Sequence, residues 1–206
     1  MHPYVQNTEF ATKNLFALAT EEERQLDELL DGLRHTEELL KIHQWDFQTS
    51  DLNDDFSDAY VMAAFHRAAK AGQETERLKG EVATLQASVG AHQYAVQAIA
   101  GAIFQIAKQG ISLVYGKPSS APAGRTLGSL AIRDIIWETR NQSMHYEEGG
   151  PRKGVKDLFA TLEQEHGLQF SLSAHAGQSR AKQVLDLLSW TNYESYLRDM
   201  HVLLPG

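Results

Sequence analysis

Residues 78–106 read LKGEVATLQASVGAHQYAVQAIAGAIFQI, and their core-type positions recur at alternating steps of four and three residues. This spacing is typical of a heptad seam, in which one stripe of a long helix packs against another helix. The neighbouring helix runs nearly parallel or antiparallel, either within the chain or across a dimer axis. The seam comprises Leu78, Val82, Leu85, Val89, His92, Val96, Ile99, Ile103 and Ile106.

The composition around this seam is that of a globular protein. The chain has 206 residues, of which 42% are hydrophobic and 22% charged, so we expect one domain over residues 1–206. The absence of cysteine excludes disulfides, thiolate metal sites and cysteine nucleophiles. No uninterrupted apolar stretch reaches the roughly 20 residues of a membrane span, and the first residues lack a signal-peptide pattern. We therefore expect a cytoplasmic protein that does not associate with a membrane.

The distribution of proline predicts an all-α fold. No proline occurs between Pro3 and Pro118, and no segment alternates polar and apolar residues as a strand would. Thr20, with Glu23 three residues later, resembles a capping box and predicts the start of a first long helix. The segment 50–58, SDLNDDFSD, is expected to end it, and a second long helix is expected over about residues 54–115. Its glycines are possible break points: Gly80, Gly90 and Gly101.

The second half of the chain is expected to hold shorter helices. A flexible loop is predicted over about residues 116–125, which include the sequence GKPSSAPAG. Further helices are expected over about residues 126–148, 155–166 and 179–204. The sequence thus predicts a bundle of five or six helices with long antiparallel members.

The charges are unevenly distributed along the chain. The formal net charge is -8, yet residues 108–156 contain eight Lys or Arg and four Asp or Glu. Residues 1–60 contain four basic and fourteen acidic residues, which favours docking of a basic partner rather than general RNA binding. A phosphate-bearing partner is therefore expected in the basic region alone.

No metal or other cofactor is predicted. Glu163 and His166 have the spacing of a helical metal-ligand pair, but a second pair and two further carboxylates are lacking. Residues 51–62 resemble a calcium loop at their start, but Phe56 replaces the glycine of the turn and Met62 the bidentate glutamate.

The segment 132–149, IRDIIWETRNQSMHYEEG, places polar residues late in a predicted helix within the basic region. At about 100° per residue, Glu138, Asn141 and His145 share one helix face, whereas Arg140 lies about 140° from His145. Arg140 and His145 meet at one phosphate only under one of three conditions. Either the helix end distorts, the long arginine side chain reaches around, or two copies of the chain meet across a symmetry axis.

The pattern Arg140-Asn141-x-x-x-His145 resembles the R-x4-6-H motif of the HEPN superfamily, helical nucleotide-binding proteins of prokaryotes and higher eukaryotes. The long helices, the seam and the C-terminal helix resemble the layout of that family. The resemblance implies a metal-independent endoribonuclease, found in toxin, antiphage or RNA-processing roles, whose active site is assembled from two motifs in a homodimer. It also implies RNA as substrate and, in some members, an antitoxin as partner.

The chemistry of metal-free RNA cleavage agrees with these residue types. Histidine moves protons near neutral pH, and a guanidinium stabilises the charge that develops on the phosphate, so His145 and Arg140 are the candidate catalytic residues. Asn141 would orient His145 or the phosphate, and Glu138 is a possible orienting residue on the same face. The flanking RNA backbone would be held by Arg152, Lys153 and Lys156.

One alternative to the ribonuclease stays open at the level of sequence. Arg140 could instead pair with Glu147 or Glu148 on the helix surface, with His145 merely near the helix end. The protein would then be a non-catalytic helical interaction or scaffold module that dimerises or binds a partner through the seam. Tyr146 follows His145 directly, one position earlier than the tyrosine that resembles an adenylylation target in one HEPN branch, which argues against that form of antitoxin control.

Overall fold

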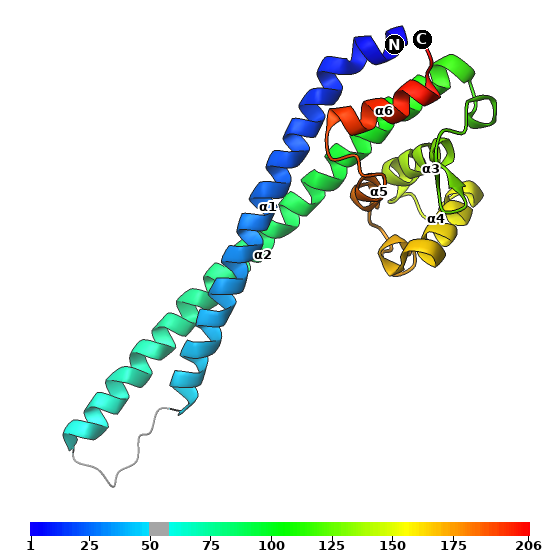
Figure 1. Cartoon of the computed structure of the whole chain (residues 1–206). Helices are drawn as coiled ribbons and strands as arrows, with labels where there is room; N and C mark the ends of the chain where they lie inside the picture. The colour runs from blue at the N-terminus through cyan, green and yellow to red at the C-terminus, as the bar shows by residue number, and fades with distance from the viewer. Residues whose placement is uncertain (50–57) are drawn as a thin grey trace. The chain divides into compact units, whose positions relative to one another are not determined.

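The computed structural model describes residues 1–49 and 58–206 (Figure 1). It confirms the all-α fold, with six α-helices in these two ranges. Two long helices come first, α1 (Pro3–Thr49) and α2 (Asp58–Tyr115). Four shorter ones follow: α3 (Ile132–His145), α4 (Lys153–His166), α5 (Ala181–Leu187) and α6 (Tyr193–Leu203). The predicted break and the rejected calcium loop fall largely on residues 50–57, which lie outside the described ranges.

The chain divides into two compact units, and both long helices contribute to each of them. The first, here the core unit, comprises Met1–Glu23 and Tyr94–Gly206. The second, here the hairpin unit, comprises Arg24–Gln93. One domain over residues 1–206 stays a prediction.

In the hairpin unit the two long helices run antiparallel, as Figure 1 shows. The heptad seam lies on the inner side of α2 and extends further toward its N-terminus than the sequence indicated. The buried residues Ala68, Ala71, Thr75, Leu78 and Val89 continue the alternating steps of three and four.

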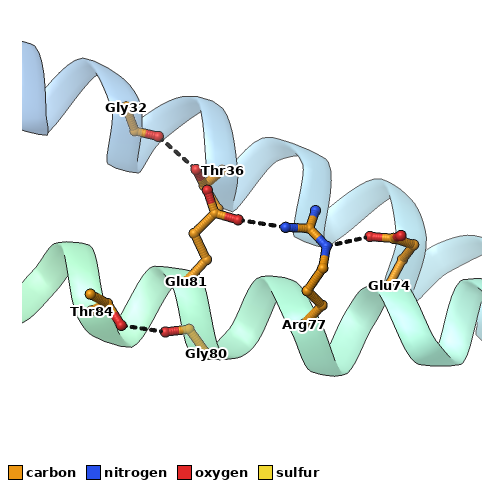
Figure 2. A network of polar contacts seen from close by, with 7 residues as sticks. All are labelled: Gly32, Thr36, Glu74, Arg77, Gly80, Glu81 and Thr84. Carbon is orange, nitrogen blue, oxygen red and sulfur yellow. Dashed lines mark hydrogen bonds and ion pairs between the residues drawn. The ribbon is translucent and has the colours of Figure 1, made fainter.

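Polar contacts accompany the seam in the same unit. Arg77 donates from Nε to Glu74 and from Nη1 to Glu81, at 2.8 Å each, one helical turn to either side (Figure 2). Thr36 and Thr84 each donate from the hydroxyl to the carbonyl of a glycine four residues earlier. Exposed pairs within one helix contribute only a few tenths of a kcal/mol each, so the apolar seam supplies most of the stability.

The core unit is built on the C-terminal part of α2, from Tyr94 onward. Its buried residues pack against α3, α4, α5 and α6 in one hydrophobic cluster. Trp190, between α5 and α6, stacks on Phe104 of α2 with ring centroids 5.5 Å apart and meets Tyr196 edge-on at 5.0 Å. The α2 residues of this cluster are Ile99, Ala100, Ile103, Phe104, Ala107 and Ile111.

The prediction that the first helix begins at Thr20 is wrong. The helix α1 begins at Pro3, and the Thr20 hydroxyl donates to the carbonyl of Phe16 at 3.0 Å from inside it. Proline suits the first turn of a helix, where its missing N–H costs no hydrogen bond. The glycines of α2 do not break it either, because it runs unbroken from Asp58 to Tyr115.

The expectation of a helix from residue 126 and of no strands is also wrong. Strands β1 (Thr126–Leu127) and β2 (Leu130–Ala131) form a short antiparallel hairpin before α3 begins at Ile132. Gly128, with a φ of 54°, supplies the left-handed turn between them. The carboxylate of Glu165 in α4 accepts from the backbone N–H of Ser129 and fixes the turn.

The predicted C-terminal helix is in fact two helices. After α5 the chain turns at Ser189, whose φ of 56° is left-handed, and Asn192 then caps α6 by accepting from the N–H of Ser195 at 2.9 Å. The helix predicted over 155–166 is confirmed as α4, which ends before Gly167 at a φ of 101°.

Residues 116–125, predicted as a flexible loop, are held by specific contacts. They include a short 3-10 helix at Pro118–Ser120 and the buried Ala121, whose carbonyl accepts from Arg133 at 2.6 Å. Arg125 makes a bidentate pair with Asp199 of α6 at 2.8 and 2.9 Å. This loop therefore ties the end of α2 to the last helix.

One described helix stretch, Val61–Tyr115, is long and apolar enough to cross a membrane by length and composition. Its most apolar window has a mean hydropathy of 1.2 and is 44% buried, and core helices of soluble proteins meet the same criterion. The cytoplasmic location stays a prediction.

Candidate active site

A cavity of about 520 Å³ opens beside the C-terminal end of α3. Its walls come from the end of α3, the turn that follows it, the first turns of α4 and the loop before α5. Its volume lies within the range of small-ligand pockets, about 300 to 1,000 Å³. The polar side chains in its lining include Asn141, His145, Tyr146, Arg152, His175 and Gln178.

His145 is the last residue of α3 and borders this cavity. Its Nδ1 lies 2.8 Å from Oε1 of Glu148, the distance of a charge-assisted hydrogen bond, and its side chain is 44% exposed. Engagement of Nδ1 by the carboxylate leaves Nε2 available to accept a proton. The geometry thus suits a solvent-accessible general base.

Arg140 is directed away from the cavity, toward α2. Its Nε donates to Oε1 of Gln105 at 2.5 Å, and its Nη1 contacts Oδ1 of Asn141 at 3.5 Å. The structure therefore does not bring Arg140 and His145 together within one chain, as their angular separation on the helix indicated. The alternative pairing of Arg140 with Glu147 or Glu148 is wrong as well, because Arg140 contacts Gln105 and Asn141. Glu147 and Glu148 instead contact Tyr146 and His145.

Asn141 is bonded to Glu138 rather than to His145, and its alternative role of orienting the phosphate stays a prediction. Its Nδ2 donates to Oε2 of Glu138 at 3.1 Å, one turn earlier on α3. Glu138 in turn lies against the first turn of α4, where a Cβ added to Gly154 would come within 2.7 Å of its Oε1. Glu138 therefore positions Asn141 at the cavity wall, and Gly154 leaves room for that carboxylate.

A second cation accompanies Arg140 on the side of α3 that faces α2. The ammonium of Lys108 lies 4.4 Å from the ring centroid of Trp137. Burial and the nearby Arg140 guanidinium both lower the pKa of Lys108. Lys108 and Arg140 both contact uncharged side chains, so their positive charges are not neutralised there. Two such cations close together suit the binding of an anion.

The three residues predicted to hold RNA lie in different places. Arg152 lines the cavity. Lys153 and Lys156 lie on the first turns of α4 with exposed side chains and do not form part of the cavity lining. The structure therefore brings Arg152 alone of the three to His145.

His175 was not predicted from the sequence, although it lines the same cavity. Its loop is held by Gln142 of α3, which donates to the carbonyl of Gln178 at 2.8 Å and accepts from the N–H of Arg180 at 2.9 Å. The guanidinium of Arg180 is buried and donates to the carbonyls of Ser179 and Gln169. Gln142 lies inside the motif segment, but its burial and its bonds to this loop could not be read from the sequence.

Tyr146 completes the cavity on the side of the turn after α3. Its hydrogen bond to Glu147, with a smaller contribution from burial, raises the pKa of its hydroxyl. The phenol is therefore neutral across the physiological range.

Within residues 1–49 and 58–206, no three potential ligands among His, Cys, Asp and Glu are grouped to hold a metal ion. Comparisons of the chain with protein-family models, with curated proteins and with solved structures give no match.

Proposed function

We propose that the protein is a metal-independent endoribonuclease that cleaves RNA by attack of a 2′-hydroxyl on the adjacent phosphate. The observation that carries the proposal is the position of His145, which borders a ligand-sized cavity together with Asn141 and Arg152. The resemblance of Arg140 to His145 to the HEPN motif supports the same activity. Because the nucleophile is the 2′-hydroxyl, RNA is the substrate and DNA is not.

In this reaction His145 accepts the proton of the 2′-hydroxyl, and a guanidinium stabilises the charge on the phosphate. Within one chain, Arg152 is the guanidinium that shares the cavity lining with His145. Arg140 and Lys108 form a separate pair of cations, with Lys108 over the ring of Trp137. We include a homodimer in the proposal, because Arg140 and His145 contact different segments within one chain and a second copy is the remaining way to bring an Arg140 to the phosphate at His145. A toxin, antiphage or stress role, with an antitoxin or another protein as regulator, follows from the family resemblance.

The test is cleavage of a labelled single-stranded RNA in EDTA, beside a DNA strand of the same sequence. We expect the wild type to cut RNA alone and His145→Ala to lose at least about 100-fold in rate. His201→Ala is the matched control, because His201 is an exposed histidine on α6 outside the cavity lining. An inactive wild type, or an active His145→Ala, would refute the proposal.

A partner-binding module is the second candidate, and one observation favours it. The hairpin unit exposes large apolar side chains toward the end of α1 and the start of α2, at 54 to 65% of their surface: Ile42, Trp45, Met62 and Phe65. The seam itself is a poor docking surface, because Leu78, Val96 and Ile103 are buried within the chain. If RNA is not cut, sedimentation velocity of the wild type and of Ile42→Ser/Phe65→Ser tests this exposed patch, since self-association through it should be lost in the variant.

A further inference from the structure

We propose that His175 is the general acid of the same site and protonates the 5′-oxygen that leaves when the RNA is cut. The inference rests on the proposed ribonuclease function and adds a residue that lies outside the Arg140 to His145 motif. It is carried by the presence of two imidazoles, from different elements, in one cavity of about 520 Å³. His145 comes from the end of α3 and His175 from the loop before α5.

The loop that carries His175 is held by hydrogen bonds, both within the loop and to α3. The His175 N–H donates to the carbonyl of Ser171 at 3.2 Å, and the His175 carbonyl accepts from the N–H of Gln178 at 3.2 Å. Gln142, inside α3, bonds this loop on both sides of Ser179 through Gln178 and Arg180. The half-buried His175 is thereby held against the helix that presents His145.

The environments of the two histidines differ in one ion-pair contact, and this contact gives His145 the role of the base in the proposal. The carboxylate of Glu148 holds Nδ1 of His145, which directs Nε2 toward accepting a proton and stabilises the imidazolium that results. The ion-pair contacts of the described chain place His145, and not His175, beside a carboxylate. His175, the other imidazole of the cavity, then takes the role of the acid.

The charged and titratable groups around the pair are few. The turn after α3 supplies Tyr146, Glu147 and Glu148, and the start of α4 supplies Arg152. Of these, only Arg152 is a cation, so it is the group in the cavity that holds the phosphate. The two imidazoles are therefore the groups of this lining whose residue type suits proton transfer near neutral pH.

The step balances without a metal or co-reactant. The 2′-oxygen forms a bond to phosphorus as its proton passes to Nε2 of His145, and the bond from phosphorus to the 5′-oxygen breaks. The leaving 5′-oxygen takes a proton from the His175 imidazolium. The products are a 2′,3′-cyclic phosphate and a 5′-hydroxyl, with His145 protonated and His175 neutral.

The test compares two substrates that differ in one atom of the leaving group. Each is a DNA strand with a single ribonucleotide, joined to the next nucleotide through a 5′-oxygen or a 5′-sulfur. A thiolate leaves without protonation, because its conjugate acid is far stronger than an alcohol. Loss of a general acid therefore slows cleavage of the oxygen substrate only.

We expect His175→Ala to cut the oxygen substrate at least about 100-fold more slowly than the wild type, and the sulfur substrate within about threefold of it. His145→Ala should be slow on both substrates, and His201→Ala should match the wild type on both. His175→Gln, which retains a polar side chain in the loop, should behave as His175→Ala does. Circular dichroism melting of each variant checks that the fold is retained.

Three results overturn the inference, and they are distinguishable. A wild type that cuts neither substrate removes the ribonuclease function together with the inference. A wild type that is active while His175→Ala and His175→Gln cut the oxygen substrate equally well leaves the function and removes His175. Equal slowing of both substrates in the two His175 variants shows a positioning role rather than proton donation.

Discussion

The Arg140 guanidinium donates from Nε to the amide oxygen of Gln105, 2.5 Å away on α2. This bond connects the motif helix α3 to the long helix and turns Arg140 away from the cavity that holds His145. Its partner is an amide rather than a carboxylate, so the positive charge of Arg140 is not neutralised there. Lys108, one turn beyond Gln105, adds to that charge near Trp137.

Gln105→Glu should convert this contact into an ion pair and reduce binding of RNA. We expect the free energy of unfolding to rise by up to about 1 kcal/mol, because a half-buried guanidinium gains a carboxylate. If Arg140 contacts a phosphate, a plot of log binding constant against log salt concentration should become less steep by about one unit of slope. Gln109→Glu is the control, since Gln109 is exposed on the same helix. Equal changes in both variants would mean that net charge alone matters.

The sequence predicted the seam because strongly apolar residues repeat there at the heptad spacing. The sequence did not predict the extension of the seam through Ala68, Ala71 and Thr75, because small residues at these positions give a weak apolar signal. The start of α1 was misplaced because the acidic run after Thr20 resembles a cap. Helix packing along the α1 segment of the core unit overrides that local signal.

Only those relationships of the site that lie within the single helix α3 could be predicted from the sequence. Helix geometry predicts that Arg140 and His145 point in different directions, and in the structure they contact different segments. The cavity wall with His175 and the position of Lys108 depend on contacts between segments far apart in sequence, which no local spacing encodes. The small hairpin before α3 was missed because strands of two residues carry no periodic pattern.

Gly110 and Gly80, both within α2, should respond to alanine in opposite directions. A Cβ on Gly110 would lie 2.7 Å from Cε1 of Tyr4 and 2.8 Å from Cδ1 of Leu204, whereas one on Gly80 meets nothing within 4 Å. We expect Gly110→Ala to lower the free energy of unfolding by about 1 to 3 kcal/mol through overpacking. Gly80→Ala should raise it by up to about 1 kcal/mol through helix propensity. Urea unfolding followed by circular dichroism measures both, and an unaffected Gly110→Ala would contradict the packing of Tyr4 on α2.

Alkaline pH should destabilise the fold through buried tyrosines. Burial raises the pKa of Tyr4 from 10.0 to about 12, and burial also raises the pKa of Tyr196. The contribution of Tyr4 is fully present below pH 10.0 and is lost as pH rises toward about 12, because the unfolded chain ionises first. Tyr4→Phe should flatten this loss, while it removes the hydrogen bond to the Ile106 carbonyl at neutral pH. Urea unfolding at a series of pH values measures the slope, and an unchanged slope in the variant would contradict the assignment.

Glu148→Gln should slow RNA cleavage at His145 while it leaves the free energy of unfolding nearly unchanged. The side chains of His145 and Glu148 are 44% and 69% exposed, so loss of their contact should change the free energy of unfolding by less than about 0.5 kcal/mol. In the proposed reaction the carboxylate stabilises the imidazolium at His145, so cleavage of RNA should fall by roughly tenfold or more. Initial rates in EDTA measure this, with Glu163→Gln on α4 as a control for the lost charge. Equal rates for Glu148→Gln and the wild type would mean that Glu148 does not assist His145, and the argument that assigns the base to His145 and the acid to His175 would lose its basis.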